Sequence, residues 1–227
     1  MIYFPTTVID NFLSEPQGCI DLANSDRVQW SKNENGDWPG VRSQPLHEID
    51  NDFWVHMMNK YFCAFWPNWL MKEQGINYRA TSFFQRISSD YDTGWIHVDY
   101  PDIHTTILYL TPNADPSCGT SLYDKKSFTT AIQHTDIKRK YYRGEISKEE
   151  QAPYLQEHNS GYVETVTFAN KFNRLIGFDS HNYHGVKNFN TSTKEERLTL
   201  VTFIHNVVTP DLPGPRIQSL PMTRDNI

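Results

Sequence analysis

The sequence is poor in cysteine, in positive charge and in long apolar runs. Its three cysteines, Cys19, Cys63 and Cys118, have no C-x-x-C spacing, which excludes a disulfide framework and a cysteine zinc site as interpretations. Lys+Arg number 21 against 27 Asp+Glu, and the net charge of −6 argues against a broad nucleic-acid surface. No run approaches the roughly 18 apolar residues of a membrane span, and the N-terminus lacks a signal-peptide pattern. These absences predict a soluble cytoplasmic protein with reduced thiols and no membrane or nucleic-acid partner.

The feature that stands out is an ordered set of polar residues: His97, Asp99, His184, Arg197 and Thr199. Two histidines and one carboxylate occupy one face of an octahedral metal and leave three positions open. Iron needs that arrangement to hold a chelating 2-oxo acid and then dioxygen. The order therefore predicts three ligands for one ferrous ion, followed by a clamp for a dicarboxylate cosubstrate.

The first two ligands are expected side by side. The segment Gly94–Asp99 is rich in β-branched and aromatic residues and is closed by Pro101, so it predicts a strand that runs into a turn. Strand side chains alternate with a period of two. His97 and Asp99 should then point the same way, with Val98 facing the opposite layer.

Two later segments complete the set. Arg174–Phe178 predicts a buried strand, and a polar stretch carries the chain from there to His184. Arg197 opens an apolar run through Ile204, and Thr199 shares its face of that strand. A guanidinium fork suits the far carboxylate of 2-oxoglutarate, and a threonine hydroxyl can add a hydrogen bond.

A competing His-x-acid pair has to be set aside. Nine histidines and 27 acidic residues in 227 positions give about one such match by chance, and a second match does occur at His134 and Asp136. That pair opens a basic stretch, predicted to be helical and ended by Gly144, which would place the two side chains on different faces. His97 and Asp99 are therefore favoured.

Taken together, these motifs resemble the iron- and 2-oxoglutarate-dependent dioxygenases, specifically the prolyl-hydroxylase-like branch. The resemblance covers roughly residues 80 to 206. Its motifs are His97–Pro101, Thr105–Thr111, Gly119–Tyr123, Asn173–Phe178, His184–Val186 and Arg197–Thr199. It implies a mainly β fold with flanking helices: a double-stranded β-helix, or jelly-roll, cupin-like barrel with N-terminal helices packed on one sheet.

The resemblance also implies roles. His97, Asp99 and His184 would bind Fe(II), and Arg197 with Thr199 would hold the distal carboxylate of 2-oxoglutarate. These are the residues of the expected site.

Two assignments keep an alternative. Tyr109 matches a position where the family often places a second partner for the same carboxylate, but it could equally be a core aromatic whose hydroxyl is satisfied elsewhere. His181 is three residues before His184 and competes as the third ligand. Gly185 and Val186 follow His184 as in the family, which favours His184.

The implied reaction consumes dioxygen, hydroxylates a C–H bond and releases succinate and CO2, with ascorbate as a candidate reductant. Because Asp99 fills the position left vacant for chloride in related halogenases, hydroxylation is favoured over halogenation. The expected substrate is a peptide, an amino acid or a small molecule. Two other functions remain open: a zinc or manganese hydrolase or isomerase on a cupin-like barrel, and a binding protein without turnover.

The length predicts one oxygenase domain over residues 1–227. Residues 1–76 are expected to give supporting helices and a strand, 77–206 the barrel core, and 207–227 an extended tail. A helical insertion is expected at about 124–160, where Ser147 and Glu150 can form a capping box.

The expected elements before the site are strands over 2–9 and 77–87 and helices over 15–24 and 50–65, the first capped by Ser14. Residues 33–45 predict a loop. Trp38 and Arg42 in that loop, with Trp95, could form part of a substrate rim, or the loop could simply fold over the core.

Overall fold

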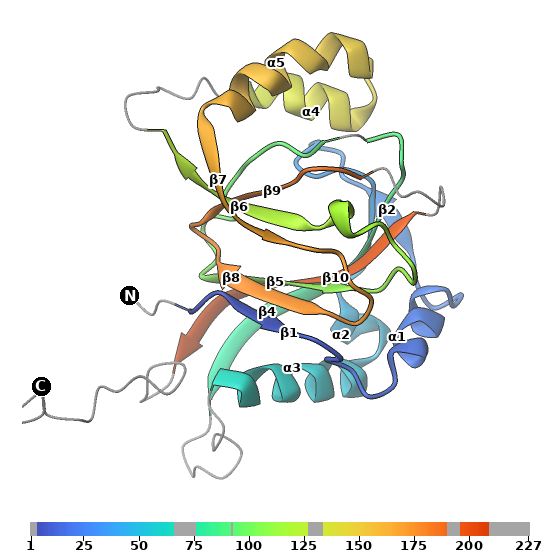
Figure 1. Cartoon of the computed structure of the whole chain (residues 1–227). Helices are drawn as coiled ribbons and strands as arrows, with labels where there is room; N and C mark the ends of the chain where they lie inside the picture. The colour runs from blue at the N-terminus through green and yellow to red at the C-terminus, as the bar shows by residue number, and fades with distance from the viewer. Residues whose placement is uncertain (1–3, 66–75, 92, 127–133, 190–195, 209–227) are drawn as a thin grey trace, which may run out of the picture.

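A computed structural model describes residues 4–65, 76–91, 93–126, 134–189 and 196–208, whose strands form two antiparallel sheets (Figure 1). The seven-stranded sheet has the order β1-β8-β5-β10-β4-β3-β2 and the three-stranded sheet the order β7-β6-β9. In chain order the strands are β1 (Thr7–Ile9), β2 (Trp30–Lys32), β3 (Val41–Ser43), β4 (Asn77–Ile87), β5 (His104–Tyr109), β6 (Thr120–Lys125), β7 (Tyr162–Phe168), β8 (Leu175–Asp179), β9 (Tyr183–Val186) and β10 (Arg197–Val208).

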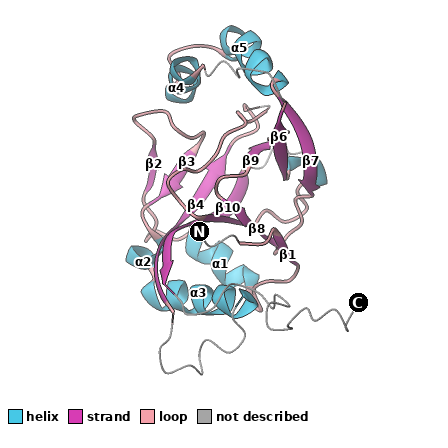
Figure 2. Ribbon diagram, turned by 90° about the vertical axis from the view of Figure 1, so that its left-hand side faces the viewer, coloured by secondary structure: helices cyan, strands magenta, loops and turns pink. Residues whose placement is uncertain are grey.

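Three helices cover the outer face of the large sheet (Figure 2): α1 (Pro16–Ala23), α2 (Leu46–Ile49) and α3 (Asn51–Phe65). Met58 and Phe62 of α3 are fully buried in the same apolar cluster as Phe84, Leu108 and Leu200 of the central strands. Burial of this apolar surface is the main force that holds the layers together. The prediction of N-terminal helices packed on one sheet is confirmed.

The opposite face of the large sheet points into the barrel. On β10 the side chains alternate, so Leu198 and Leu200 face the helices while Arg197, Thr199 and Val201 face inward. A second apolar cluster fills the closed end between the two sheets, and it consists of Ile107, Tyr109, Leu122, Phe168, Ile176 and Phe178. The two sheets therefore share a core, and the predicted double-stranded β-helix is confirmed.

Two further helices, α4 (Thr135–Arg143) and α5 (Lys148–Ser160), lie between β6 and β7 in sequence and above the three-stranded sheet (Figure 1). Gly144 ends α4 in the left-handed conformation, with φ 78°. Ser147 and Glu150 form the expected capping box at the start of α5. A 3-10 turn, η2 (Pro116–Cys118), precedes β6.

Several element predictions need correction. The strand expected over 2–9 is confined, in the described part, to β1, and α1 has Glu15 at its N-cap without any side-chain cap from Ser14. The loop expected at 33–45 contains β3, because Val41 and Arg42 pair with the edge of β4. Most of the extended tail predicted at 207–227 lies outside the described residues. None of the described helices combines the length and apolarity that a membrane crossing requires.

Candidate metal centre and its pocket

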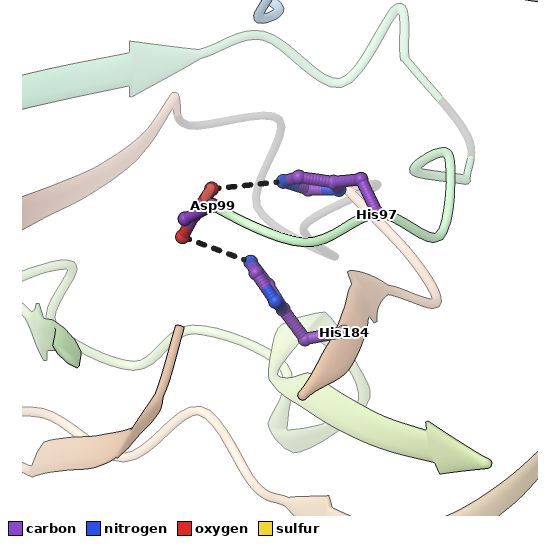
Figure 3. Close-up of side chains that lie close together, drawn as sticks. All are labelled: His97, Asp99 and His184. Carbon is purple, nitrogen blue, oxygen red and sulfur yellow. Dashed lines mark ion pairs between the residues drawn. The ribbon is translucent and has the colours of Figure 1, made fainter. Parts of the chain in front are cut away.

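Side chains from two distant segments meet at the open end of the barrel. His97 and Asp99 lie between β4 and β5, and His184 lies in β9; one ligand atom from each falls within 4.8 Å of the others (Figure 3). Nε2 of His97 is 3.6 Å from Oδ1 of Asp99, and Nε2 of His184 is 3.3 Å from its Oδ2. This is the one group of three such residues found in the described part of the chain.

The segment that carries the first two ligands is not the strand expected over Gly94–Asp99. Only His97 makes a β-bridge, with His184: each backbone N–H donates to the other's carbonyl oxygen at 2.9 Å. The backbone N–H of Asp99 donates to the carbonyl of Ser180 instead, also at 2.9 Å. The sequence pattern indicated a strand because β-branched and aromatic residues fill the segment. Its pairing with β9 is limited to this bridge and to a 2.7 Å hydrogen bond from the Gly94 N–H to the Val186 carbonyl, so no continuous strand forms.

The insertion holds the same segment from the other side. Oδ1 of Asn159 in α5 accepts from the Ile96 N–H at 3.1 Å, and its Nδ2 donates to the Gly94 carbonyl at 3.1 Å. The indole N–H of Trp95 donates to Gln151 Oε1 at 3.1 Å. These α5 contacts were missed by sequence reasoning, because nothing in the sequence links an amide on a helix to a loop so far away.

Both imidazoles are oriented for metal binding through Nε2. Nδ1 of His97 lies 2.7 Å from the Trp95 carbonyl and Nδ1 of His184 lies 3.0 Å from the Asn182 carbonyl. A carbonyl oxygen can only accept, so each Nδ1 carries a proton, and each ring in its neutral form presents the lone pair of Nε2. These lone pairs face the carboxylate of Asp99. Electron pairs that converge in this way need a cation between them, and backbone partners of this kind orient histidine ligands in metal sites.

The charge states fit the same interpretation. Burial lowers the pKa of His97 to about 3, so this imidazole is neutral at physiological pH. Burial opposes ionisation of Asp99, yet the two histidines and a 2.7 Å hydrogen bond from Thr105 Oγ1 keep its pKa below the usual range. Burial also opposes charge on His184, but Asp99 raises its pKa overall. A proton and a metal cation therefore compete for the gap between His184 and Asp99.

Arg197 and Thr199 share the inward face of β10, and Arg197 lines the pocket of the metal group. Arg197 is 2% exposed; its Nε donates to the Cys118 carbonyl at 3.0 Å, while its Nη2 is buried and has no hydrogen-bond partner in the described chain. The hydroxyl of Thr199 is also buried without a partner there. Unsatisfied buried polar atoms are costly, so native proteins rarely leave them without a ligand or water. Two such donors on one strand face fit a bound carboxylate.

Tyr109 is fully buried beside this clamp. Its hydroxyl donates to Thr120 Oγ1 at 3.0 Å, and the guanidinium carbon of Arg197 lies 5.3 Å from its ring centroid. The ring thus packs against the guanidinium while the hydroxyl already has a partner. Its predicted role as a carboxylate ligand stays a prediction.

The competing histidines lie elsewhere. His181 Nδ1 is 3.0 Å from Asp179 Oδ1 and its side chain is 48% exposed, outside the three-residue group. His134 pairs with Glu157 of α5 at 2.9 Å. The residues expected as a substrate rim, Trp38, Arg42 and Trp95, do line the pocket of the metal group. Lys138 of α4 lines it as well, and sequence reasoning did not assign it to the site.

Solved structures of similar fold include prolyl 4-hydroxylases and a protein with nickel and 2-oxoglutarate bound. HygX from Streptomyces hygroscopicus, solved with nickel and 2-oxoglutarate bound, superposes with a TM-score of 0.53 at 11% identity, covering 88% of this chain and 82% of that one. A prolyl-4-hydroxylase from Pseudomonas putida superposes with a TM-score of 0.45 at 12% identity, covering 88% of this chain and 92% of the other. Prolyl 4-hydroxylases from Phytophthora capsici give 0.45 at 16% identity, covering 97% of this chain but only 64% of the length of the other.

At these identities the similarity is one of fold alone, and the HygX structure, whose TM-score exceeds 0.5, is the one that supports it. No curated protein matches the chain in sequence. One family does match, over residues 76–204, a span that includes both sheets' central strands, the three clustered residues and the Arg197 clamp. Because this span is more than half of the chain, the protein belongs to DUF6445, a family of unknown function.

Proposed function

We propose that this protein is an Fe(II)- and 2-oxoglutarate-dependent dioxygenase that hydroxylates a C–H bond of a peptide, an amino acid or a small molecule, with release of succinate and CO2. The observation that carries the proposal is the coincidence of two features in one pocket. One is the His97, Asp99 and His184 group, and the other is Arg197, which lines the same pocket with an unpartnered Nη2. The hydroxyl of Thr199, two residues further along the same face of β10, is also unpartnered among the described residues.

His97, Asp99 and His184 would hold the iron, and their protonation pattern supports this. When bound, iron and 2-oxoglutarate would supply the oxidising chemistry with dioxygen, which no amino-acid side chain provides. Three protein ligands leave three coordination positions, enough for a bidentate 2-oxo acid and one further molecule. Thr105 would keep Asp99 in place through the 2.7 Å hydrogen bond to its Oδ2.

Arg197 and Thr199 would bind the distal carboxylate of 2-oxoglutarate. The guanidinium is anchored at Nε by the Cys118 carbonyl and by the Tyr109 ring, so Nη2 is the donor left for a ligand. A guanidinium that is already held in place loses little conformational freedom when it binds 2-oxoglutarate, which favours affinity and a fixed orientation of the ligand. The surrounding wall is apolar, with Ile107 and Val201 among its residues, and would exclude water from the reacting groups.

An anaerobic titration of the full chain with Fe(II) and 2-oxoglutarate tests the proposal. We expect the weak visible charge-transfer band of a chelated 2-oxo acid, followed by succinate formation when air and ascorbate are admitted. Absence of the band would reject the oxygenase and leave a metal hydrolase or isomerase as the alternative. A band without succinate, across substrate panels, would indicate a binding protein that has lost turnover.

A further inference from the structure

The pocket of the metal group holds two cations that the proposed function does not use. Arg42 of β3 and Lys138 of α4 both line it, and they come from opposite sides, one from the large sheet and one from the helical insertion.

Arg42 lies in an aromatic box with its hydrogen-bonding capacity almost unused. Its guanidinium carbon is 4.4 Å from the Trp38 ring centroid, 5.2 Å from that of Phe203 and 5.9 Å from that of Phe83. Its Nε is buried without a partner, and its Nη2 has only a 3.5 Å contact with Gln85 Oε1. The box holds the flat group by cation–π contacts and leaves its edge free.

Lys138 makes no ion pair with an acid among the described residues, although Asp37 and Asp99 act on its charge from a distance. Its Nζ lies 5.9 Å from the Tyr142 ring centroid, and burial lowers its pKa. Asp37, the nearest acid of the pocket wall apart from the metal group, is already engaged at 2.9 Å by Arg139. A half-buried ammonium that makes no ion pair is better stabilised when a ligand supplies a negative charge beside it.

The charges of the loaded pocket do not balance without a further anion. The two positive charges of iron and the charge of Arg197 would be balanced by Asp99 and by the two carboxylates of 2-oxoglutarate. Asp37 and Arg139 balance each other. The charges of Arg42 and Lys138 then remain uncompensated in a pocket that the proposed function leaves open for one more molecule.

We propose that the substrate carries a carboxylate, which Arg42 binds with the free edge of its guanidinium and which Lys138 contacts from the insertion. The inference rests on the proposed function and narrows its substrate class to carboxylic acids, such as a free or N-acylated amino acid or the C-terminus of a peptide. A carboxylate is favoured over other anions because two N–H groups along one edge of the planar guanidinium match its two coplanar oxygens.

The first test needs no ligand. Arg42→Met removes the buried charge and fills its space, so the thermal midpoint of the protein without substrate should rise, by roughly 2 °C or more. Arg86→Met is the matched control: Arg86 also stacks on an indole, 4.3 Å from the Trp30 centroid, but it donates to Ala23 and Asn24 and lies outside this pocket. Because those hydrogen bonds are lost, Arg86→Met should lower the thermal midpoint. An unchanged or lower midpoint for Arg42→Met would assign Arg42 to the fold and overturn the proposal.

The second test uses chosen probes on the protein saturated with Ni(II) and 2-oxoglutarate. Acetate, benzoate and N-acetylglycine are each compared with the corresponding amide, by calorimetry and by thermal shift. At least one carboxylate should bind tenfold or more tightly than its amide. That preference should disappear in Arg42→Met and weaken in Lys138→Met, but persist in Lys140→Met, which alters an exposed lysine of the same helix.

Each remaining outcome decides against the proposal. It is overturned if no carboxylate exceeds its amide, if the preference survives in both Arg42→Met and Lys138→Met, or if phenyl phosphate binds more tightly than benzoate. A loss of 2-oxoglutarate binding in Arg42→Met would instead make Arg42 the cosubstrate clamp. Failure of the proposed function is distinguishable, because 2-oxoglutarate and Ni(II) would then not bind the wild-type chain at all.

Discussion

Two backbone hydrogen bonds connect His97 and His184: the N–H of each residue donates to the carbonyl oxygen of the other at 2.9 Å. Their rings consequently stand side by side, with centroids 4.4 Å apart. The spacing of the two imidazoles is thus set by sheet-type pairing and does not depend on a ligand. A metal entering this site would meet ligands already held in place, which reduces the ordering cost of binding.

The first prediction concerns the third ligand. His184→Ala should reduce Ni(II) or Fe(II) affinity by more than the roughly 10–100-fold that loss of an outer-sphere partner costs, because a direct ligand is removed. His181→Ala is the control, since His181 contacts Asp179 and lies outside the three-residue group. Metal affinity is measured by competition with a chelator. Equal losses in the two variants would contradict the assignment of His184.

The second prediction concerns the carboxylate clamp. Arg197→Met should weaken 2-oxoglutarate binding by about a hundredfold or more, because one member of a buried charge pair is lost. Thr199→Val keeps the shape and removes the hydroxyl, so about a tenfold loss is expected. Both are followed through the charge-transfer band at fixed Fe(II).

Metal affinity without 2-oxoglutarate serves as the internal control, because neither side chain belongs to the metal group. A clamp variant that binds metal normally and 2-oxoglutarate poorly would separate the two halves of the site. Wild-type 2-oxoglutarate affinity in Arg197→Met would rule this clamp out.

The long central helix and strand could be predicted from the sequence because their hydrophobic residues recur with a regular spacing over many positions. Strand β4 begins and ends at the predicted residues, Asn77 and Ile87, and α3 buries the predicted apolar stripe, including Met57 and Tyr61. Each of these elements repeats its period often enough to outweigh local exceptions. The order of the motifs also predicts the clustering of His97 and His184 that the structure shows.

The segments at the mouth of the barrel were not predictable, because long-range contacts decide their structure. The pattern of Gly94–Asp99 predicts a strand, but the segment makes only one β-bridge, with His184 of β9, and is otherwise held by Asn159 and Ser180. Arg42 reads as a loop residue, yet it is part of β3 because it pairs with Gln85. In both cases tertiary contacts override the local propensity.

The third prediction uses a surface ion cluster that joins the end of β1 to the turn before β8. Asp10 accepts from Arg174 Nε at 2.6 Å and Nη2 at 3.0 Å, and from Lys171 Nζ at 2.8 Å. Arg174, and then Lys171, lower the pKa of Asp10 far below its usual value. A lowered folded pKa stabilises the protein above the unfolded pKa of about 3.9, and that contribution is lost as the pH falls toward the folded value.

Asp10→Asn should therefore cost about 0.5–1 kcal/mol at pH 7, after allowance for solvent screening of a partly exposed group. The difference from wild type should shrink as the pH falls below about 4, since the wild-type carboxyl then loses its charge. Urea unfolding of both proteins at pH 7 and pH 3 measures this difference in unfolding free energy. Asp26→Asn, on an exposed turn, should show no such trend. A difference that grows toward low pH would contradict this account.

The last prediction concerns the insertion as a support for the metal group. Asn159→Ala removes both hydrogen bonds to the backbone of Gly94 and Ile96, so the segment before His97 should loosen. We expect the unfolding free energy to fall by about 1–2 kcal/mol, Ni(II) affinity to fall by about tenfold and the Ile96 amide to exchange faster. Gln156→Ala, an exposed amide on the same helix, should change none of these. If Asn159→Ala loses stability but keeps wild-type Ni(II) affinity, α5 supports the fold without setting the position of His97.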